Sequence, residues 1–375
     1  VLTVGGAGPQ VTGVSVQGTL PAPVSTISVR FSEPILRASF TPEDVTLTGP
    51  SGDVAVTQIV QQGDDLYQIV FPAQNDAGAY TVSIGPGVTD LATVPMDQDG
   101  DGVSNEPGDD VFRAMFAIDN AGPSVLGVEP TGPVNTALSQ ILIDFDQELA
   151  FDTVGGDDFA LTGPDGSAIG VSVTPVGLTQ VRLNFTAQTT SGDYTLSVGP
   201  AITDRLGLAM NEDGDAIAGE PEDAFTTSVT VALPDLVVGG LTAPLAAPAG
   251  TVVSATWTTT NAGVADAVAP WREQIVLSSD DVLGNGDDQL LVDRITSADV
   301  AAAGVAPRQA DVTLPFGLEG DFTLFVVEDR AAQVVESDET NNVDSIGITI
   351  TASLPPADLI VDAVQAPSAA GIGGP

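Results

Sequence analysis

The stretch "YTVSIGPGVTD", from Tyr80 to Asp90, returns 114 residues later as "YTLSVGPAITD", from Tyr194 to Asp204. Segments 8–120 and 122–234 match at this offset, and we read the match as free of gaps. Chance does not hold register over such a length. The sequence therefore predicts two copies of one domain, as in a repeat array.

Within each copy, apolar residues alternate with polar ones, as at Tyr80, Val82 and Ile84. Short runs of period two, separated by Gly-Pro, Asp-Gly and Ser-Gly turns, are typical of half-buried strands. We expect no more than a single helical turn in 38–45 and in 150–159. Seven or so strands in about 110 residues is the count of an immunoglobulin-like β-sandwich. The predicted fold class is all-β, with tandem immunoglobulin-like sandwiches in an elongated array.

A glycine stands two residues before the tyrosine in "NDAGAY" (Asn75–Tyr80) and in "TTSGDY" (Thr189–Tyr194). This spacing is typical of a tyrosine corner, in which the hydroxyl binds the backbone upstream. The alternative is a strand tyrosine whose ring is simply part of the core. Both interpretations give the tyrosines an architectural role.

The chain has 375 residues and a formal net charge of -42, from 51 acidic residues against nine basic ones, all arginine. It contains no lysine, histidine or cysteine, which excludes disulfides, thiolate zinc sites, histidine-based triads and P-loop lysines. The electrostatic field of so negative a chain repels nucleic acid and anionic lipid and attracts calcium and magnesium. We therefore expect no nucleic-acid partner. A saline habitat is a competing explanation for the acidity.

No run of 18 apolar residues occurs, because prolines and glycines interrupt the most apolar region, 229–257. We therefore expect no membrane span. Val1 follows no basic n-region and no cleavage motif, and we expect the chain to be an excerpt from a longer protein.

The motifs "VRFSEPI" (Val29–Ile35), "DVTLTGP" (Asp44–Pro50) and "YTVSIGPGVTD" resemble the bacterial Ig-like domains of large secreted and surface proteins. The resemblance covers both copies. It implies an extracellular or cell-surface location in a secreted bacterial protein.

The next part of the chain resembles the CARDB module, a bacterial sandwich named for its relation to cell adhesion. The motifs that carry this resemblance are "PDLVVGGLTAP" (Pro234–Pro244), "SATWTTTNAGVADA" (Ser254–Ala267), "GDFTLFVVED" (Gly320–Asp329) and "VVESDETNNV" (Val334–Val343). "ADLIVDAVQAP" (Ala357–Pro367) repeats the first of them. The predicted domains are a closing strand at 1–7, Ig-like domains at 8–120 and 121–232, a CARDB-like sandwich at 233–352, and a linker with the first strand of another such module at 353–375.

The stretch "MDQDGDGVSNEPGDDVF", from Met96 to Phe112, concentrates carboxylates in a chain with few charges. Aspartates at alternate positions followed by glycine let a short loop wrap oxygens around one calcium. An EF-hand would need a glutamate at the twelfth position, where Gly108 stands, and we expect no flanking helices. The predicted ligands are Asp97, Asp99, Asp101, the carbonyl of Val103, Asp109 and Asp110. The alternative is a solvated acidic turn, but carboxylates this close repel one another unless a cation neutralises them.

The second copy reads "MNEDGDAIAGEPEDAF", from Met210 to Phe225. It keeps oxygen-bearing residues at the first three ligand positions, but Ala216 replaces the glycine. At the gapless offset, Glu222 takes the twelfth position. A second, more tolerant calcium site is predicted, with ligands Asn211, Asp213, Asp215, the carbonyl of Ile217, Glu222 and Asp223.

The CARDB-like part has two further acidic clusters, for which metal binding and ordinary turn chemistry are both open. The first comprises Asp280, Asp281, Asn285, Asp287 and Asp288. The second comprises Glu336, Asp338, Glu339, Asn341 and Asn342.

Catalysis is not expected, because a carboxylate pair needs a cleft and aromatic residues make up only 5% of the chain. We expect Trp257 to be a core residue and Trp271, beside Arg272, to be exposed. Two functions remain: a calcium-stiffened structural rod, such as a surface filament, sheath, S-layer-like coat or adhesin stalk, and a spacer or recognition region of a secreted enzyme. For the rod, the expected partners are neighbouring copies or domains and a surface or matrix ligand. The strands Val1–Val4 and Asp358–Val364 are candidates for pairing between chains.

Overall fold

The computed structural model describes residues 6–214, 217–353 and 363. The predicted terminal strands Val1–Val4 and Asp358–Val364 therefore fall almost entirely outside the described residues, as does Asp215. Strands and short 3-10 turns are the regular elements of the described chain, which confirms the all-β prediction. Those residues include no helix long and apolar enough to cross a membrane.

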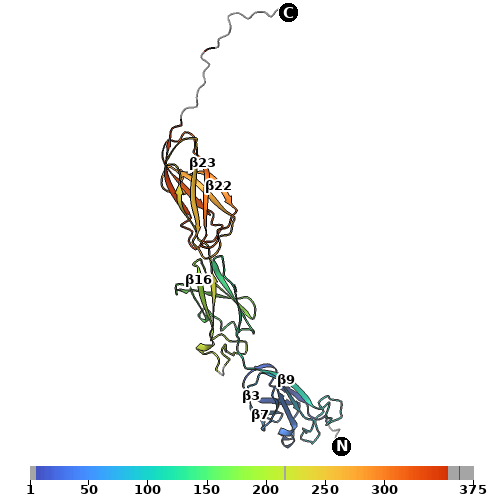
Figure 1. Ribbon diagram of the computed structural model, residues 1–375. Helices are drawn as coiled ribbons and strands as arrows, with labels where there is room; N and C mark the ends of the chain where they lie inside the picture. The colour runs from blue at the N-terminus through green and yellow to red at the C-terminus, as the bar shows by residue number, and fades with distance from the viewer. Residues whose placement is uncertain (1–5, 215–216, 354–362, 364–375) are drawn as a thin grey trace, which may run out of the picture. The chain divides into compact units, whose positions relative to one another are not determined.

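The strands of the first domain form two sheets (Figure 1), and their inward residues make one core around Phe31, Phe40 and Tyr67. Strand β2 pairs with β9 in parallel, and the other pairs within these two sheets are antiparallel. The first sheet has the order β1 (Val11–Val14), β3 (Val24–Phe31), β7 (Leu66–Gln74), β6 (Gln58–Gln61). The second has the order β2 (Gly18–Pro21), β9 (Phe112–Asp119), β8 (Gly78–Ile84), β4 (Val45–Gly49), β5 (Gly52–Val54).

The second domain repeats this arrangement. Its first strand even carries the same register shift as β1, between Val125 and Gly127 here and between Val11 and Gly13 there. One sheet has the order β10 (Val125–Glu129), β11 (Leu138–Phe145), β15 (Gln180–Gln188), β14 (Ser172–Pro175). The other has the order β13 (Ala168–Ile169), β12 (Phe159–Thr162), β16 (Gly192–Val198), β17 (Phe225–Val231).

The third domain also consists of two sheets, packed around Trp257, Leu277 and Val326. Its three-stranded sheet has the order β18 (Leu236–Thr242), β20 (Val252–Asn261), β23 (Val305–Thr313). Its five-stranded sheet has the order β19 (Ala246–Pro248), β25 (Val343–Thr351), β24 (Gly320–Glu328), β21 (Trp271–Ser278), β22 (Gln289–Thr296). The predicted domain boundaries stay predictions.

Single helical turns lie in both segments where the sequence predicts them. These 3-10 turns are η2 (Pro42–Asp44) and η3 (Gly156–Asp158), and each leads directly into a strand. Two more are η1 (Arg37–Ser39) and η4 (Pro221–Asp223). Tyr80 forms a tyrosine corner, because its hydroxyl donates to the carbonyl of Asp76 at 3.0 Å.

The expectation of a gapless repeat is wrong. Phe112 begins β9 and Phe225 begins β17, so the offset is 113 residues at this point rather than 114. Asp110 and Asp223 are both fully buried and both accept a hydrogen bond from the backbone of the loop glutamate. The second copy thus lacks one residue just before Asp223, and Asp223 is the counterpart of Asp110.

The expectation that Trp271 is exposed is also wrong, whereas Trp257 is a core residue as predicted. Trp271 is fully buried, and its indole N–H donates to Glu328 at 2.7 Å. The partner carboxylate lies 57 residues further along the chain. The polar neighbours Arg272 and Glu273 suggested a surface, but Trp271 begins a strand whose alternate residues face inward.

Candidate metal centre

The acidic loop, residues 97–110, is fixed at both ends by buried residues. Met96 is fully buried, its N–H donates to the carbonyl of Val88, and its own carbonyl accepts the N–H of Asn105. At the other end, Asp110 leads into β9. Gly102 has a φ of 89°, in the left-handed region that favours glycine, which is where the sequence predicts a sharp turn.

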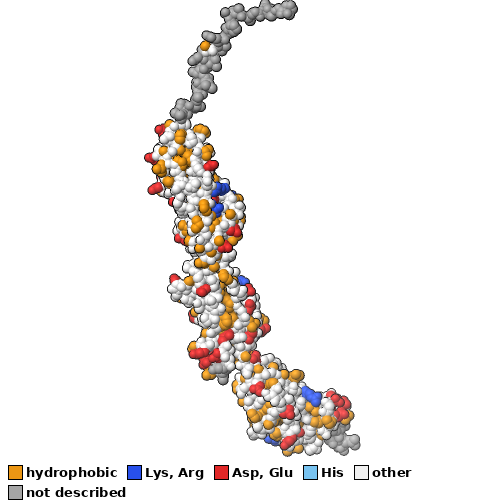
Figure 2. Space-filling model, viewed as in Figure 1, with side chains coloured by type: hydrophobic (Ala, Val, Ile, Leu, Met, Phe, Trp, Pro, Cys, Tyr) orange, Lys and Arg blue, Asp and Glu red, His pale blue; other side chains and the backbone are white. Residues whose placement is uncertain are grey.

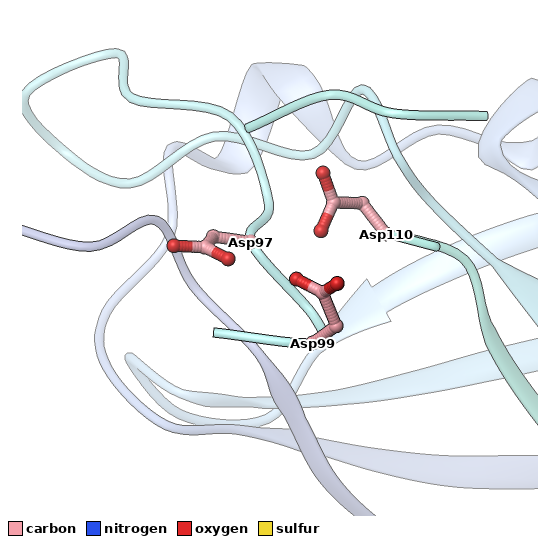
Figure 3. A group of neighbouring side chains, drawn as sticks. All are labelled: Asp97, Asp99 and Asp110. Carbon is pink, nitrogen blue, oxygen red and sulfur yellow. The ribbon is translucent and has the colours of Figure 1, made fainter. Parts of the chain in front are cut away.

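Three carboxylates of this loop lie together (Figure 3). One oxygen each of Asp97, Asp99 and Asp110 lies within 4.8 Å of the others, and the three side chains surround a common space. Asp97 and Asp110 are buried, whereas Asp99 is exposed. A second group of the same size shares Asp99 and adds Asp101 and Glu106. The loop thus concentrates oxygen ligands of the kind that calcium and magnesium prefer.

Backbone groups of the loop satisfy Asp110 but only half of Asp97. The two oxygens of Asp110 accept the N–H groups of Gln98 at 2.7 Å and Glu106 at 2.8 Å, which ties the two ends of the loop together. Oδ2 of Asp97 accepts the N–H of Gly102 at 3.1 Å. Oδ1 of Asp97 is buried without a hydrogen-bond partner. An unpaired buried carboxylate oxygen is costly, and a bound cation would supply the missing partner.

The loop also lacks a compensating positive charge among the described residues. None of the ion pairs found there includes a carboxylate of residues 97–110. Partial desolvation, and then repulsion from Asp101, Asp109, Asp110 and Asp99, raises the pKa of Glu106. Figure 2 shows that arginines are sparse on the visible face of the chain. The residues present therefore fit a divalent cation.

Not every predicted ligand joins the two groups. Asp109 is exposed and belongs to neither. Val103 is exposed, and its N–H donates to Asp101 at 2.7 Å. Glu106 was missed by the sequence analysis, although the Glu-Pro pair at 106–107 returns at 220–221 and marks a position that both copies retain.

The corresponding loop of the second domain keeps part of this arrangement. Asp223 is fully buried, its Oδ2 accepts the N–H of Glu220 at 3.1 Å, and its Oδ1 has no hydrogen-bond partner. Asn211 accepts the N–H of Gly214 at 2.8 Å. Glu222 and Ile217 are exposed, and Glu222 does not occupy a ligand position of the first copy. With Asp215 outside the described residues, the described part of this loop brings no three carboxylates together.

The loop after β21 in the third domain uses its acidic residues for turn hydrogen bonds. Asp280 accepts from the N–H of Val282 and from the amide of Asn285, Asp287 accepts from Ser278 and Ser279, and Asp288 accepts the N–H of Gly284. Asp281 is exposed. No metal-sized group of three carboxylates forms here among the described residues. Oδ1 of Asp288 is buried without a hydrogen-bond partner, but in the absence of a third nearby carboxylate in the described chain the geometry favours the turn interpretation for this loop.

Residues 233–346 match the CARDB family model. The search of curated proteins gives no match. Among solved structures, the CARDB domain of the PF1109 protein from Pyrococcus furiosus, in complex with di-metal ions, is 17% identical, with 32% of this chain and 96% of that chain covered and a TM-score of 0.26. The Escherichia coli adhesin FdeC is 12% identical, with 93% and 99% covered and a TM-score of 0.36. A structure of titin domains is 11% identical, with 93% and 100% covered and a TM-score of 0.30.

The family match and the observed sheets agree on where the third domain lies. The immunoglobulin-like sandwiches precede residue 233, and the third pair of sheets coincides with the matched segment. Residues 233–346 are accordingly a CARDB domain, which follows tandem immunoglobulin-like β-sandwich domains.

Proposed function

We propose that this chain is part of a non-catalytic extracellular structural protein, a rod of sandwich domains that calcium stiffens. Repeated domains that contact only their neighbours build extended objects such as filaments, sheaths, coats and stalks. The proposed location is the bacterial cell surface or its surroundings, and the proposed partners are further copies of the protein and a surface or matrix ligand.

The observation that carries the proposal is the buried Oδ1 of Asp97. This oxygen has no partner, yet it belongs to a carboxylate that lies within reach of those of Asp99 and Asp110. Two buried carboxylates without an arginine are unfavourable unless a cation binds between them. A cation from outside the chain would therefore supply the positive charge that the described residues do not place beside the loop.

Calcium suits this loop better than magnesium. Calcium accepts six to eight oxygen ligands in flexible geometry, whereas magnesium demands a near-ideal octahedron and keeps several waters. An irregular loop with exposed Asp99 and Asp101 beside buried Asp97 and Asp110 provides many oxygens without octahedral symmetry.

The test is calorimetric unfolding of the full chain in EDTA, in millimolar calcium and in millimolar magnesium. A ligand that binds only the folded state stabilises it by about 2.7 kcal/mol at a hundred times its dissociation constant. We expect calcium to raise the melting temperature of one Ig-like transition, and we expect a double substitution, Asp97→Asn with Asp99→Asn, to abolish the rise.

The matched control is Asp64→Asn, which removes one charge from an exposed position in the same domain. It should leave the calcium effect intact. An equal rise with magnesium and with plain salt, or a rise that survives the double substitution, contradicts a calcium site. The acidic loop would then be a solvated turn.

Polymerisation through terminal strands remains a separate proposal, because those strands lie outside the described residues. If strand exchange joins the chains, deletion of Val1–Gly6 should abolish polymers in sedimentation experiments while the calorimetric transitions persist. Polymers of unchanged length after the deletion would rule it out.

A further inference from the structure

In each Ig-like domain, the segment through which the chain enters the domain contacts the acidic loop or its counterpart, and the residue just before that loop. We call residues 8–11 and 122–125 the lead-in segments of the first and second domains. A Cβ atom on Gly8 would lie 1.6 Å from the carbonyl oxygen of Pro95, just before the acidic loop. Gly122 stands in the same relation to Ala209, also at 1.6 Å. Only glycine allows this approach of two backbones.

Side chains add hydrogen bonds to the contact. In the first domain the amide of Gln98 binds both backbone groups of Val11, accepting its N–H at 2.8 Å and donating to its carbonyl at 3.2 Å. The amide of Gln10 donates to the carbonyl of Asp97 at 2.8 Å. The lead-in segment is therefore held by the acidic loop through three side-chain hydrogen bonds.

Gln98 lies between two of the candidate ligands, Asp97 and Asp99. Its own N–H is held by a third, Asp110, at 2.7 Å. A cation that draws Asp97, Asp99 and Asp110 together fixes the backbone on both sides of Gln98. Without the cation, repulsion among these carboxylates favours their separation, which would displace the backbone of Gln98 and weaken its hydrogen bonds to Val11.

We propose that cation binding in the acidic loop fixes the lead-in segment on its domain, so that metal occupancy controls how firmly the chain is anchored where it joins an Ig-like domain. This inference rests on the proposed calcium site and names what that site regulates. Because coupling between two events is reciprocal, loss of the Gln98 contacts weakens calcium binding by the same factor that calcium strengthens the anchoring.

The two domains differ at both side chains of this contact, because Ser124 replaces Gln10 and Glu212 replaces Gln98. The counterpart of Gln98 is Glu212, whose carboxylate accepts the N–H of Val125 at 2.7 Å. An ionised carboxylate cannot donate, so the bond to the Val125 carbonyl has no equivalent here. The acidic loop thus holds Val125 by one hydrogen bond instead of two, while Asp146 and Gln147 hold Ser124 and Gly122. Glu212→Gln restores the missing donor.

The experiment is hydrogen exchange of the full chain, followed on peptides that contain Val11 and Val125, in calcium and in EDTA. Calcium should slow exchange of the Val11 peptide by roughly fivefold or more, within the usual range of coupling between sites. Gln98→Ala should remove this protection and weaken calcium binding by a similar factor. Gln58→Ala, on the exposed side of β6, should change neither, and Glu212→Gln should increase protection at Val125.

Isothermal titration on the same samples separates the possible failures. Calcium binding with unchanged exchange at Val11 overturns the inference and leaves the calcium site standing. Absence of calcium binding overturns both. Should Gln98→Ala unfold the domain, Gln98→Glu keeps the acceptor and removes the donor, and it should reduce the calcium-dependent protection at Val11. Unchanged protection in that variant overturns the inference.

Discussion

The acidic loop of the first domain and the interior of the CARDB domain both bury carboxylates, but their surroundings differ. In the loop, Asp97 and Asp110 receive only backbone N–H groups, and one oxygen receives nothing. In the CARDB domain, Glu328 accepts hydrogen bonds from the side chains of Trp257, Thr259 and Trp271. The loop is open to completion from outside, whereas the CARDB domain supplies its own donors.

The two regions also differ in what balances the negative charge of their carboxylates. Glu273, beside Glu328 in the CARDB domain, contacts the guanidinium of Arg294, and Nε of Arg308 lies 3.9 Å from it. Burial, and then repulsion and hydrogen bonding from Glu328, raises the pKa of Glu273 to about 7. A proton and two arginines therefore balance this pair, while none of the ion pairs among the described residues reaches the acidic loop. The same residue types thus predict dependence on pH in one region and dependence on metal in the other.

The largest expected effect comes from removing Glu328. Glu328→Ala leaves two indole N–H groups and the hydroxyl of Thr259 without their acceptor, and each buried donor left unsatisfied costs roughly 1–3 kcal/mol. Urea unfolding followed by tryptophan fluorescence measures the loss selectively, because both tryptophans of the chain lie in this domain. Glu319→Ala, at an exposed position, is the control. A cost below about 1 kcal/mol would contradict this hydrogen-bond network around Glu328.

A smaller effect is expected from pH. The folded-state pKa of Glu273, about 7, lies above its ordinary value of 4.5, so its contribution to stability is fully present below pH 4.5 and is lost as pH rises through 7. The difference corresponds to at most roughly 3 kcal/mol. Glu336, whose pKa burial also raises to about 7, adds to the loss over the same range. Urea midpoints at several pH values should fall in this window, and Glu273→Gln should reduce the fall without abolishing it.

The smallest effect has the opposite sign and tests the acidic loop. In EDTA, Asp97→Asn should raise the stability of the first domain by about 1 kcal/mol, because it removes a buried charge that no cation balances. The second copy already carries Asn211 at this position. The same variant should lose the stabilisation by calcium. A lower stability in EDTA would show that the Asp97 carboxylate is satisfied within the chain, and the contrast between the two regions would disappear.

Much of the candidate site could be predicted from local sequence. Alternating aspartates followed by glycine indicated a loop around oxygens, and Asp97, Asp99, Asp101 and Asp110 do lie in the two carboxylate groups. Glu106 was overlooked because it fits no short motif, and Asp109 was included only for its proximity in sequence. Of the adjacent residues Asp109 and Asp110, only Asp110 is buried. Which of them faces inward depends on the register of the chain where it enters β9, and a shift of one residue would exchange them.

The sequence by itself determined the strands, the duplicated domain, the CARDB segment and the position of the acidic loop. These follow from periodicity, turn residues and repetition, all of which are local or comparative properties of the chain. Only the tertiary structure decided that Trp271 is buried against Glu328, that Asp223 corresponds to Asp110, and that Gln98 holds Val11. Each of these contacts joins residues distant in sequence or depends on register, and burial and hydrogen-bond partners arise only when such segments pack together.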